Sequence, residues 1–139
     1  MALDLSGLHR AVNSLERAVK TASSMIGKVV DSDQDEVVRA GVIQNFEFTY
    51  EMCWKFIRRW LEINGEGALV DGATRKEIFR IAAERRLIDN PQDWFDYTKA
   101  RNETAHTYNP AIAEEVYDKA LLFLDVAKRL VVALEARND

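Results

Sequence analysis

The chain has 139 residues, is 47% hydrophobic and 30% charged, and carries a formal net charge of −4. These values suit a single domain over residues 1–139 that can bury a core, and they exclude collagen-like and disordered chains. The negative charge argues against a broad basic surface for nucleic acid, and no run of about 18 apolar residues is present to span a bilayer.

The first residues lack the basic start and apolar stretch of a signal peptide, so we expect a cytoplasmic protein. A single cysteine, Cys53, cannot form an internal disulfide and falls in an apolar stripe, where it is expected to be buried. One cysteine and two distant histidines do not make a metal-ligand cluster, and nothing in the sequence indicates a cofactor.

Apolar residues recur at steps of three and four, the spacing of an amphipathic helix. The first expected helix runs from about Asp4 to Asp31, with one buried face. Its apolar positions are Leu5, Leu8, Val12, Leu15, Val19, Ala22, Ile26 and Val29.

The second expected helix runs from about Asp35 to Asn64 and carries two apolar stripes. It should therefore be buried on two sides, as a central bundle helix or one that also meets a second subunit. Its aromatic residues are expected in the core or a dimer interface rather than in base stacking. These are Trp54, Phe56 and Trp60.

Glycines at 65 and 67 are expected to end this helix. A capping-box pattern in residues 74–77 predicts a third, shorter helix to about Arg86. Asparagine followed by proline occurs at 90–91 and again at 109–110, and each pair predicts a helix start. The fourth helix should end near Thr104, and a last, long helix should follow the second pair. The sequence predicts an all-α antiparallel bundle of about five helices, three long and two short.

The segment 101–108, RNETAHTY, holds the residues best suited to chemistry. Arg101 continues the inward stripe of Trp94 and Tyr97 on the fourth helix. His106 lies five residues later, about 140° further round an ideal helix, so it cannot share that face. If the helix ends first, a tight connection from His106 onward lets the histidine turn back towards Arg101.

The pattern R-N-x-x-x-H-x-Y resembles the R-x4-6-H signature of HEPN domains, and a tyrosine two residues after the histidine is typical of HepT-like proteins. The segment 46–55, FEFTYEMCWK, is similar to the nucleotidyltransferase substrate-binding branch of that group. The resemblance covers nearly the whole chain. It implies a HEPN-like four-helix up-and-down core, a homodimer, and a minimal nucleotidyltransferase encoded alongside as partner in a toxin–antitoxin-like pair.

The resemblance also implies a metal-independent ribonuclease site in which Arg101 and His106 are catalytic and Asn102 orients the arginine or the loop. Histidine can transfer protons near neutral pH, and arginine can bind the scissile phosphate and stabilise its growing charge. The partner would adenylylate Tyr108 to silence the nuclease. If the protein binds RNA, the acidic net charge favours a focused cleft between subunits over a broad surface.

Two other functions stay open. The same branch has been interpreted as a non-catalytic subunit that presents a substrate, RNA or a nucleotide, to the nucleotidyltransferase. A dimeric scaffold with a vestigial motif is the third. In that case Arg101 is a structural ion-pair residue, His106 a cap or hydrogen-bonding residue, and Tyr108 an ordinary loop tyrosine. His9 has no partner motif and is expected on the surface.

Glu47 stands where an apolar stripe of the second helix calls for an apolar residue. A carboxylate in such a place needs a charged or hydrogen-bonding partner, because unpaired desolvation is costly. We predict a Glu47–Arg101 pair that fixes the guanidinium. The alternative is an ordinary pair on the helix surface, such as Glu51–Lys55.

Overall fold

Six α-helices and two helical turns follow one another in the computed structural model, which describes residues 2–25 and 32–138. These described residues contain no strand, so the predicted all-α class is confirmed. The elements are α1 (Ser6–Met25), α2 (Ser32–Leu61), a π-helical turn η1 (Glu62–Glu66), α3 (Gly67–Val70), α4 (Arg75–Glu84), α5 (Pro91–Glu103), a 3₁₀ turn η2 (Thr104–His106) and α6 (Pro110–Ala136).

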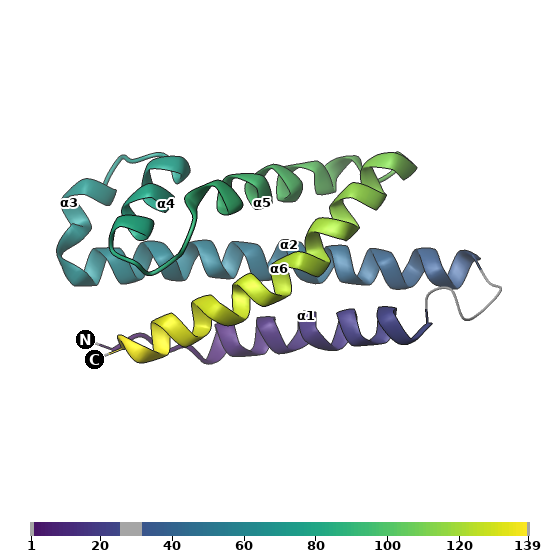
Figure 1. The fold of residues 1–139 in the computed structure, drawn as a ribbon, viewed down its shortest axis with the longest axis horizontal. Coiled ribbons are helices and arrows are strands. Elements are labelled where there is room, and N and C mark those ends of the chain that lie inside the picture. The colour runs from purple at the N-terminus through teal and green to yellow at the C-terminus, as the bar shows by residue number, and fades with distance from the viewer. Residues whose placement is uncertain (1, 26–31, 139) are drawn as a thin grey trace.

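The long helices alternate in direction, as predicted for an antiparallel bundle (Figure 1). Helix α1 runs antiparallel along α2, α5 runs antiparallel to α2 on another side, and α6 returns obliquely across it. The short helices α3 and α4 lie at the end of the bundle where α2 finishes. The two ends of the chain also meet at this end, where the Asn138 side chain makes hydrogen bonds of 2.7 and 2.9 Å with the backbone of Leu3.

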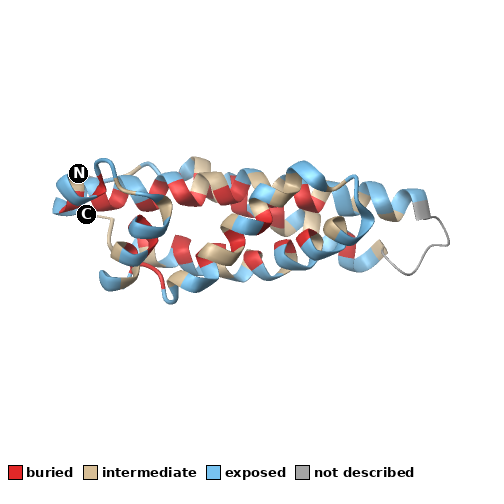
Figure 2. Cartoon of the chain, turned by 90° about the horizontal axis from the view of Figure 1, so that it is seen from above, coloured by how far each residue is buried: buried red, intermediate tan, exposed pale blue. Residues whose placement is uncertain are grey.

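Helix α2 is the central element, which explains its two apolar stripes. Its buried residues face α1 on one side and α5 and α6 on others, and Figure 2 shows buried positions along the inner faces of the helices. Cys53 is fully buried, as predicted. The aromatic residues that we assigned to the core are buried too. They are Trp54, Phe56 and Trp60.

An aromatic cluster joins α2, α5 and α6 at the middle of the bundle. Phe123 of α6 lies 5.3 Å from Phe46 of α2 and 4.9 Å from Tyr97 of α5, measured between ring centroids. The Trp94 ring meets Phe123 edge-on at 5.6 Å. Edge-to-face contacts of this kind add to the stability that burial provides. The cluster holds α5 against α2 and so decides which residues of the two helices can meet.

The predicted helix starts are present. Thr74 caps α4 in a complete capping box with Glu77, and the asparagines at 90 and 109 accept from backbone N–H groups at the starts of α5 and α6. Proline stands at the beginning of both helices. These features depend on neighbouring residues alone, which is why the sequence predicted them.

Several boundaries differ from the predictions. Within the described residues α1 ends at Met25, and the apolar positions predicted at 26 and 29 lie outside them. Helix α2 begins at Ser32 rather than Asp35, while α4 and α5 each stop within two residues of the expected end. The turn after α2 occurs at Gly65, whose φ of +90° favours glycine, whereas Gly67 begins α3 instead of ending α2.

Candidate functional site

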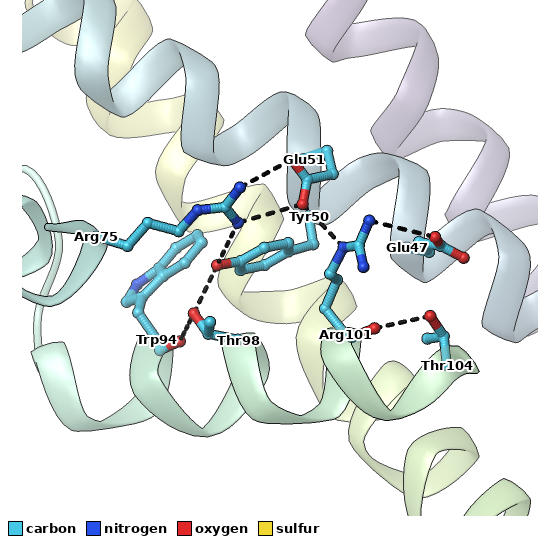
Figure 3. Close-up of polar contacts among 8 residues, drawn as sticks. All are labelled: Glu47, Tyr50, Glu51, Arg75, Trp94, Thr98, Arg101 and Thr104. Atoms are coloured by element: carbon cyan, nitrogen blue, oxygen red, sulfur yellow. Dashed lines mark hydrogen bonds and ion pairs between the residues drawn. The ribbon is translucent and has the colours of Figure 1, made fainter. Parts of the chain in front are cut away.

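Arg101 projects from the last turn of α5 towards α2 (Figure 3). Its Nε donates a hydrogen bond of 2.9 Å to Oε1 of Glu51, and its Nη2 lies 3.4 Å from Oε1 of Glu47. The predicted Glu47–Arg101 ion pair is therefore present, but the hydrogen bond that fixes the guanidinium is made to Glu51 and not to Glu47. The Glu47 side chain is 41% exposed, more than its place in an apolar stripe suggested, and Glu51 is the closer partner.

Glu51 is the residue that sequence reasoning missed. The partner that we considered for it was Lys55, in a pair on the helix surface, but its carboxylate contacts Arg101 and Arg75 instead. Arg101 belongs to α5 and Arg75 to α4. Glu47 and Glu51 lie one helical turn apart, so one face of α2 presents both carboxylates to Arg101. The spacing of one helical turn between the two glutamates was the available signal. Lys55 lies one turn beyond Glu51, so the sequence fits a surface pair between these two residues equally well.

Arg75 is held by several groups at the start of α4. Its guanidinium lies over the Trp54 ring, 4.7 Å from the centroid, and donates to both oxygens of Glu51 at 3.2 and 3.5 Å. Its Nη1 also donates to the Tyr50 hydroxyl at 3.4 Å. The guanidinium is thus fixed by stacking and by hydrogen bonds together.

The Tyr50 hydroxyl extends this network into α5. Thr98 donates its proton to the backbone carbonyl of Trp94 at 2.7 Å, so the 2.5 Å contact between Tyr50 and Thr98 has Tyr50 as donor. Burial raises the pKa of the Tyr50 phenol above its ordinary value, so the hydroxyl remains a donor even in mildly alkaline solution. Arg75, Tyr50 and Thr98 therefore form one directed chain of donors that ends on the helix carrying Arg101.

His106 is exposed at the end of η2, and within the described residues no hydrogen bond or ion pair joins it to Arg101. The expected approach of the histidine to the arginine is thus not accompanied by a polar contact in this single chain. The chain continues α5 in tighter 3₁₀ form, held by a 2.7 Å bond from the Thr104 hydroxyl to the Arg101 carbonyl, instead of folding back. The imidazole meets the Tyr108 ring edge-on, with 6.1 Å between centroids.

Asn102 and Tyr108 also face solvent. Asn102 is exposed, and the described structure gives its side chain no hydrogen bond to Arg101, because adjacent helix positions point about 100° apart. Tyr108 is 84% exposed. The motif thus has one anchored member, Arg101, and three members available to another molecule.

A groove of about 840 Å³ lies beside the motif, between the first half of α2, η2 and the start of α6. Tyr108, Thr104 and Thr107 line it on one side, while Glu47 and Arg39 contribute from α2. Because Glu47 also pairs with Arg101, the groove adjoins the arginine and contains the tyrosine.

No group of three or more His, Cys, Asp or Glu side chains among the described residues is arranged to hold a metal ion. No described helix combines the length and apolar character needed to cross a membrane. His9, expected on the surface, is half-exposed and lies 3.6 Å from a carboxylate oxygen of Glu135.

Comparison with protein families matches residues 3–136 to the family described as nucleotidyltransferase substrate binding protein like. The chain belongs to this family. A similar protein is the probable ribonuclease HepT of Haemophilus influenzae, 35% identical over 143 residues that cover 99% of this chain and 95% of the relative.

Two solved structures have a similar fold, and the first of them agrees with this family assignment. A Haemophilus influenzae protein with the fold of a substrate binding domain of a nucleotidyltransferase superposes with a TM-score of 0.86 at 32% identity, over 95% of this chain and 99% of that protein. A Thermus thermophilus protein superposes with a TM-score of 0.65 at 25% identity, over 86% of this chain and 98% of that one.

Proposed function

We propose that this chain is the HEPN-type subunit of a two-component, toxin–antitoxin-like system with a minimal nucleotidyltransferase, and that it cleaves RNA without a metal ion. The observation that carries the proposal is that Arg101 is anchored by its contacts with Glu51 and Glu47. It lies in the same motif as the exposed His106. The similarity to a probable ribonuclease over almost the full chain supports it.

Arg101 is suited to a phosphate group. A guanidinium has five N–H donors, and only Nε donates a hydrogen bond within the described structure, while Nη2 faces Glu47. The outer Nη edge therefore has donors left for two oxygens of a scissile phosphate. In the transition state these donors stabilise the charge that grows on the phosphate oxygens.

His106 supplies the proton transfer. As the base, a neutral imidazole takes the proton of the ribose 2′-hydroxyl, whose oxygen attacks phosphorus while the bond to the 5′-oxygen breaks. The leaving oxygen then needs a proton from an acid. One chain has a single histidine in the motif, so a homodimer, with a second His106, provides both groups. Exposure of His106 is consistent with a site completed by a second subunit.

Tyr108 is the proposed point of control by the partner. Its hydroxyl is accessible to a nucleotidyltransferase, and it lines the same groove as Glu47. An adenylate attached there would place an anionic group close to Arg101 and compete with RNA phosphate. Asn102, exposed beside the arginine, would contact the loop or the RNA rather than Arg101 itself.

A second function is favoured by the solved relative with the fold of a nucleotidyltransferase substrate binding domain. In that case the chain presents a substrate to the partner enzyme and cleaves nothing. Arg101 would still bind a phosphate, but His106 would be dispensable.

Cleavage of a labelled RNA in excess EDTA separates these functions. We would compare the purified wild-type protein with Arg101→Ala and His106→Ala, and use Arg17→Ala and His9→Ala as controls of the same residue types outside the motif. Thermal unfolding of each variant tests folding. The mass of the wild-type protein shows whether it already carries an adenylate.

Cleavage by the wild-type protein and both controls, with loss in the two motif variants, is the expected result. If unmodified wild-type protein is folded and does not cut, the ribonuclease proposal fails and the binding function takes its place. If the motif variants cut as well as the wild type, Arg101 and His106 are not catalytic.

A further inference from the structure

Glu51 links the two arginines at the candidate site. Its Oε1 accepts from Arg101 Nε at 2.9 Å and from Arg75 Nη1 at 3.2 Å, so a single oxygen holds guanidinium groups from two helices. One arginine belongs to the motif, whereas the other has no place in it.

The contact with Glu51 engages the inner edge of the Arg101 guanidinium. A carboxylate at Nε fixes the rotation of the planar group about its last side-chain bonds, because the N–H must point at the oxygen. Of the two Nη groups, Nη2 makes only the looser 3.4 Å approach to Glu47, and neither donates a hydrogen bond within the described structure. Glu51 thereby leaves the outer edge for another anion.

Arg75 in turn keeps Glu51 in place. The carboxylate receives both Nη groups of Arg75, and Arg75 is itself stacked on Trp54 and bonded to Tyr50. Fully flexible glutamate and arginine side chains lose considerable rotamer entropy when they pair. Here much of that loss occurs on folding, before any RNA is bound.

We infer that Glu51, anchored by Arg75, is a positioning residue that orients Arg101 for the scissile phosphate. The inference deepens the proposed function and rests on it. Arg75 acts through Glu51 and contacts no reacting atom in this scheme.

Neutralising Glu51 should have opposite effects on RNA binding and on the rate of the chemical step. The four groups Glu47, Glu51, Arg75 and Arg101 sum to zero formal charge, so Glu51→Gln leaves a net positive site that attracts RNA at least as well. The neutral amide holds the Nε–H more weakly, and misorientation lowers the rate of the chemical step. A purely structural role would not separate KM from kcat in this way.

The experiment measures kcat and KM for RNA cleavage in EDTA for the wild type and Glu51→Gln. The matched control is Glu62→Gln, which removes one negative charge from an exposed pair with Arg58 near the end of the same helix. We expect kcat to fall about 10-fold or more in Glu51→Gln, with KM unchanged or lower, and no change in the control.

Arg75→Lys is the second variant and keeps the proposal testable if Glu51→Gln does not fold. It retains the charge but cannot bind both oxygens of Glu51 in a planar fork, so kcat should fall with KM unchanged. Wild-type kcat in a folded Glu51→Gln protein overturns the inference. A higher KM at unchanged kcat also overturns it, since Glu51 would then act in binding.

A measurement that needs no cleavage separates this inference from the proposed function. The ¹⁵N–¹H signal of the Arg101 Nε–H, assigned with Arg101→Lys, reports the hydrogen bond to Glu51. Its exchange with solvent should be slow in the wild type and clearly faster in Glu51→Gln. If the wild type does not cleave RNA, the proposed function fails. The orientation of Arg101 by Glu51 is upheld if exchange is faster in Glu51→Gln than in the wild type, and it is rejected if the two exchange rates are equal.

Discussion

The buried carboxylate of Glu66 pairs with the guanidinium of Arg85 across the junction of η1 and the end of α4. Only 6% of the Glu66 side chain is exposed, whereas Arg85 is more than half exposed. The pair connects the turn after α2 to the segment that leads into α5. It therefore stabilises the end of the bundle that carries Arg75.

Removal of Arg85 should cost much more stability than removal of an exposed partner. In Arg85→Ala the Glu66 carboxylate stays buried without its cation, and we expect a loss of about 2 kcal/mol in the free energy of unfolding by urea. Arg58→Ala, from the exposed Arg58–Glu62 pair, should lose about 0.5 kcal/mol or less. Equal losses in the two variants would contradict the importance of burial at Glu66.

The capping box of α4 should influence the candidate site as well as stability. Thr74→Ala removes the acceptor for the Glu77 backbone N–H and should cost about 1 kcal/mol. Because Arg75 is the first residue of α4, fraying there loosens its hold on Glu51. Amide hydrogen exchange at residues 75–78 should rise in Thr74→Ala. Thr21→Ala, at an exposed position of α1, is the control and should leave this exchange unchanged.

The phenol of Tyr50 predicts a specific response to high pH. Burial raises its pKa above the ordinary value of 10.0, so the folded protein holds this proton more tightly than the unfolded chain does. The resulting stabilisation is complete below about pH 10 and is lost as the pH rises through the folded pKa.

Tyr50→Phe should therefore be less stable than the wild type at pH 7, by about 1 kcal/mol for the lost hydrogen bonds. Above pH 10 the two unfolding curves should converge, because only the wild type has this phenol to ionise. Tyr108→Phe, at an exposed position, is the control and should be as stable as the wild type at pH 7. A gap between wild type and Tyr50→Phe that stays constant up to pH 11 would argue against the raised pKa.

Cys53 should report global unfolding. Burial raises the pKa of its thiol, and the thiolate that reacts with disulfide reagents is scarce in the folded protein. We expect labelling at pH 8 to be about 10³-fold slower in buffer than in denaturing urea, since the core must open first. Comparable rates in the two conditions would mean that the α2 core opens locally. Cys53→Ala provides the blank, because the chain has no other cysteine.

Local chemistry determined most of the helices from the sequence alone. The caps at Thr74, Asn90 and Asn109 lie where their neighbours predicted, since a cap is decided by residues within one turn. The turn at Gly65 was predicted from the glycine, whereas the buried Glu66 and the start of α3 at Gly67 were missed, because a glycine does not reveal whether the next residues resume a helix.

One contact of the candidate site was also predicted from the sequence. Glu47 interrupts an apolar stripe of α2, and the sequence thereby indicated the Glu47–Arg101 pair. The expected burial of Glu47 was wrong, because its side chain is 41% exposed. The catalytic roles of Arg101 and His106 remain predictions, because they depend on an RNA and a second subunit.

Only the tertiary structure decided which cation Glu51 meets. In sequence Lys55 is its natural partner one turn away, yet the aromatic cluster packs α5 against α2 and brings Arg101 to Glu51. Phe79 of α4 contacts the Trp54 and Trp94 rings, and the packing of α4 brings Arg75 to the same carboxylate. Helical periodicity shows that a face is buried, but it does not show which helix covers it. The choice between a surface pair and a site therefore depended on how the helices pack.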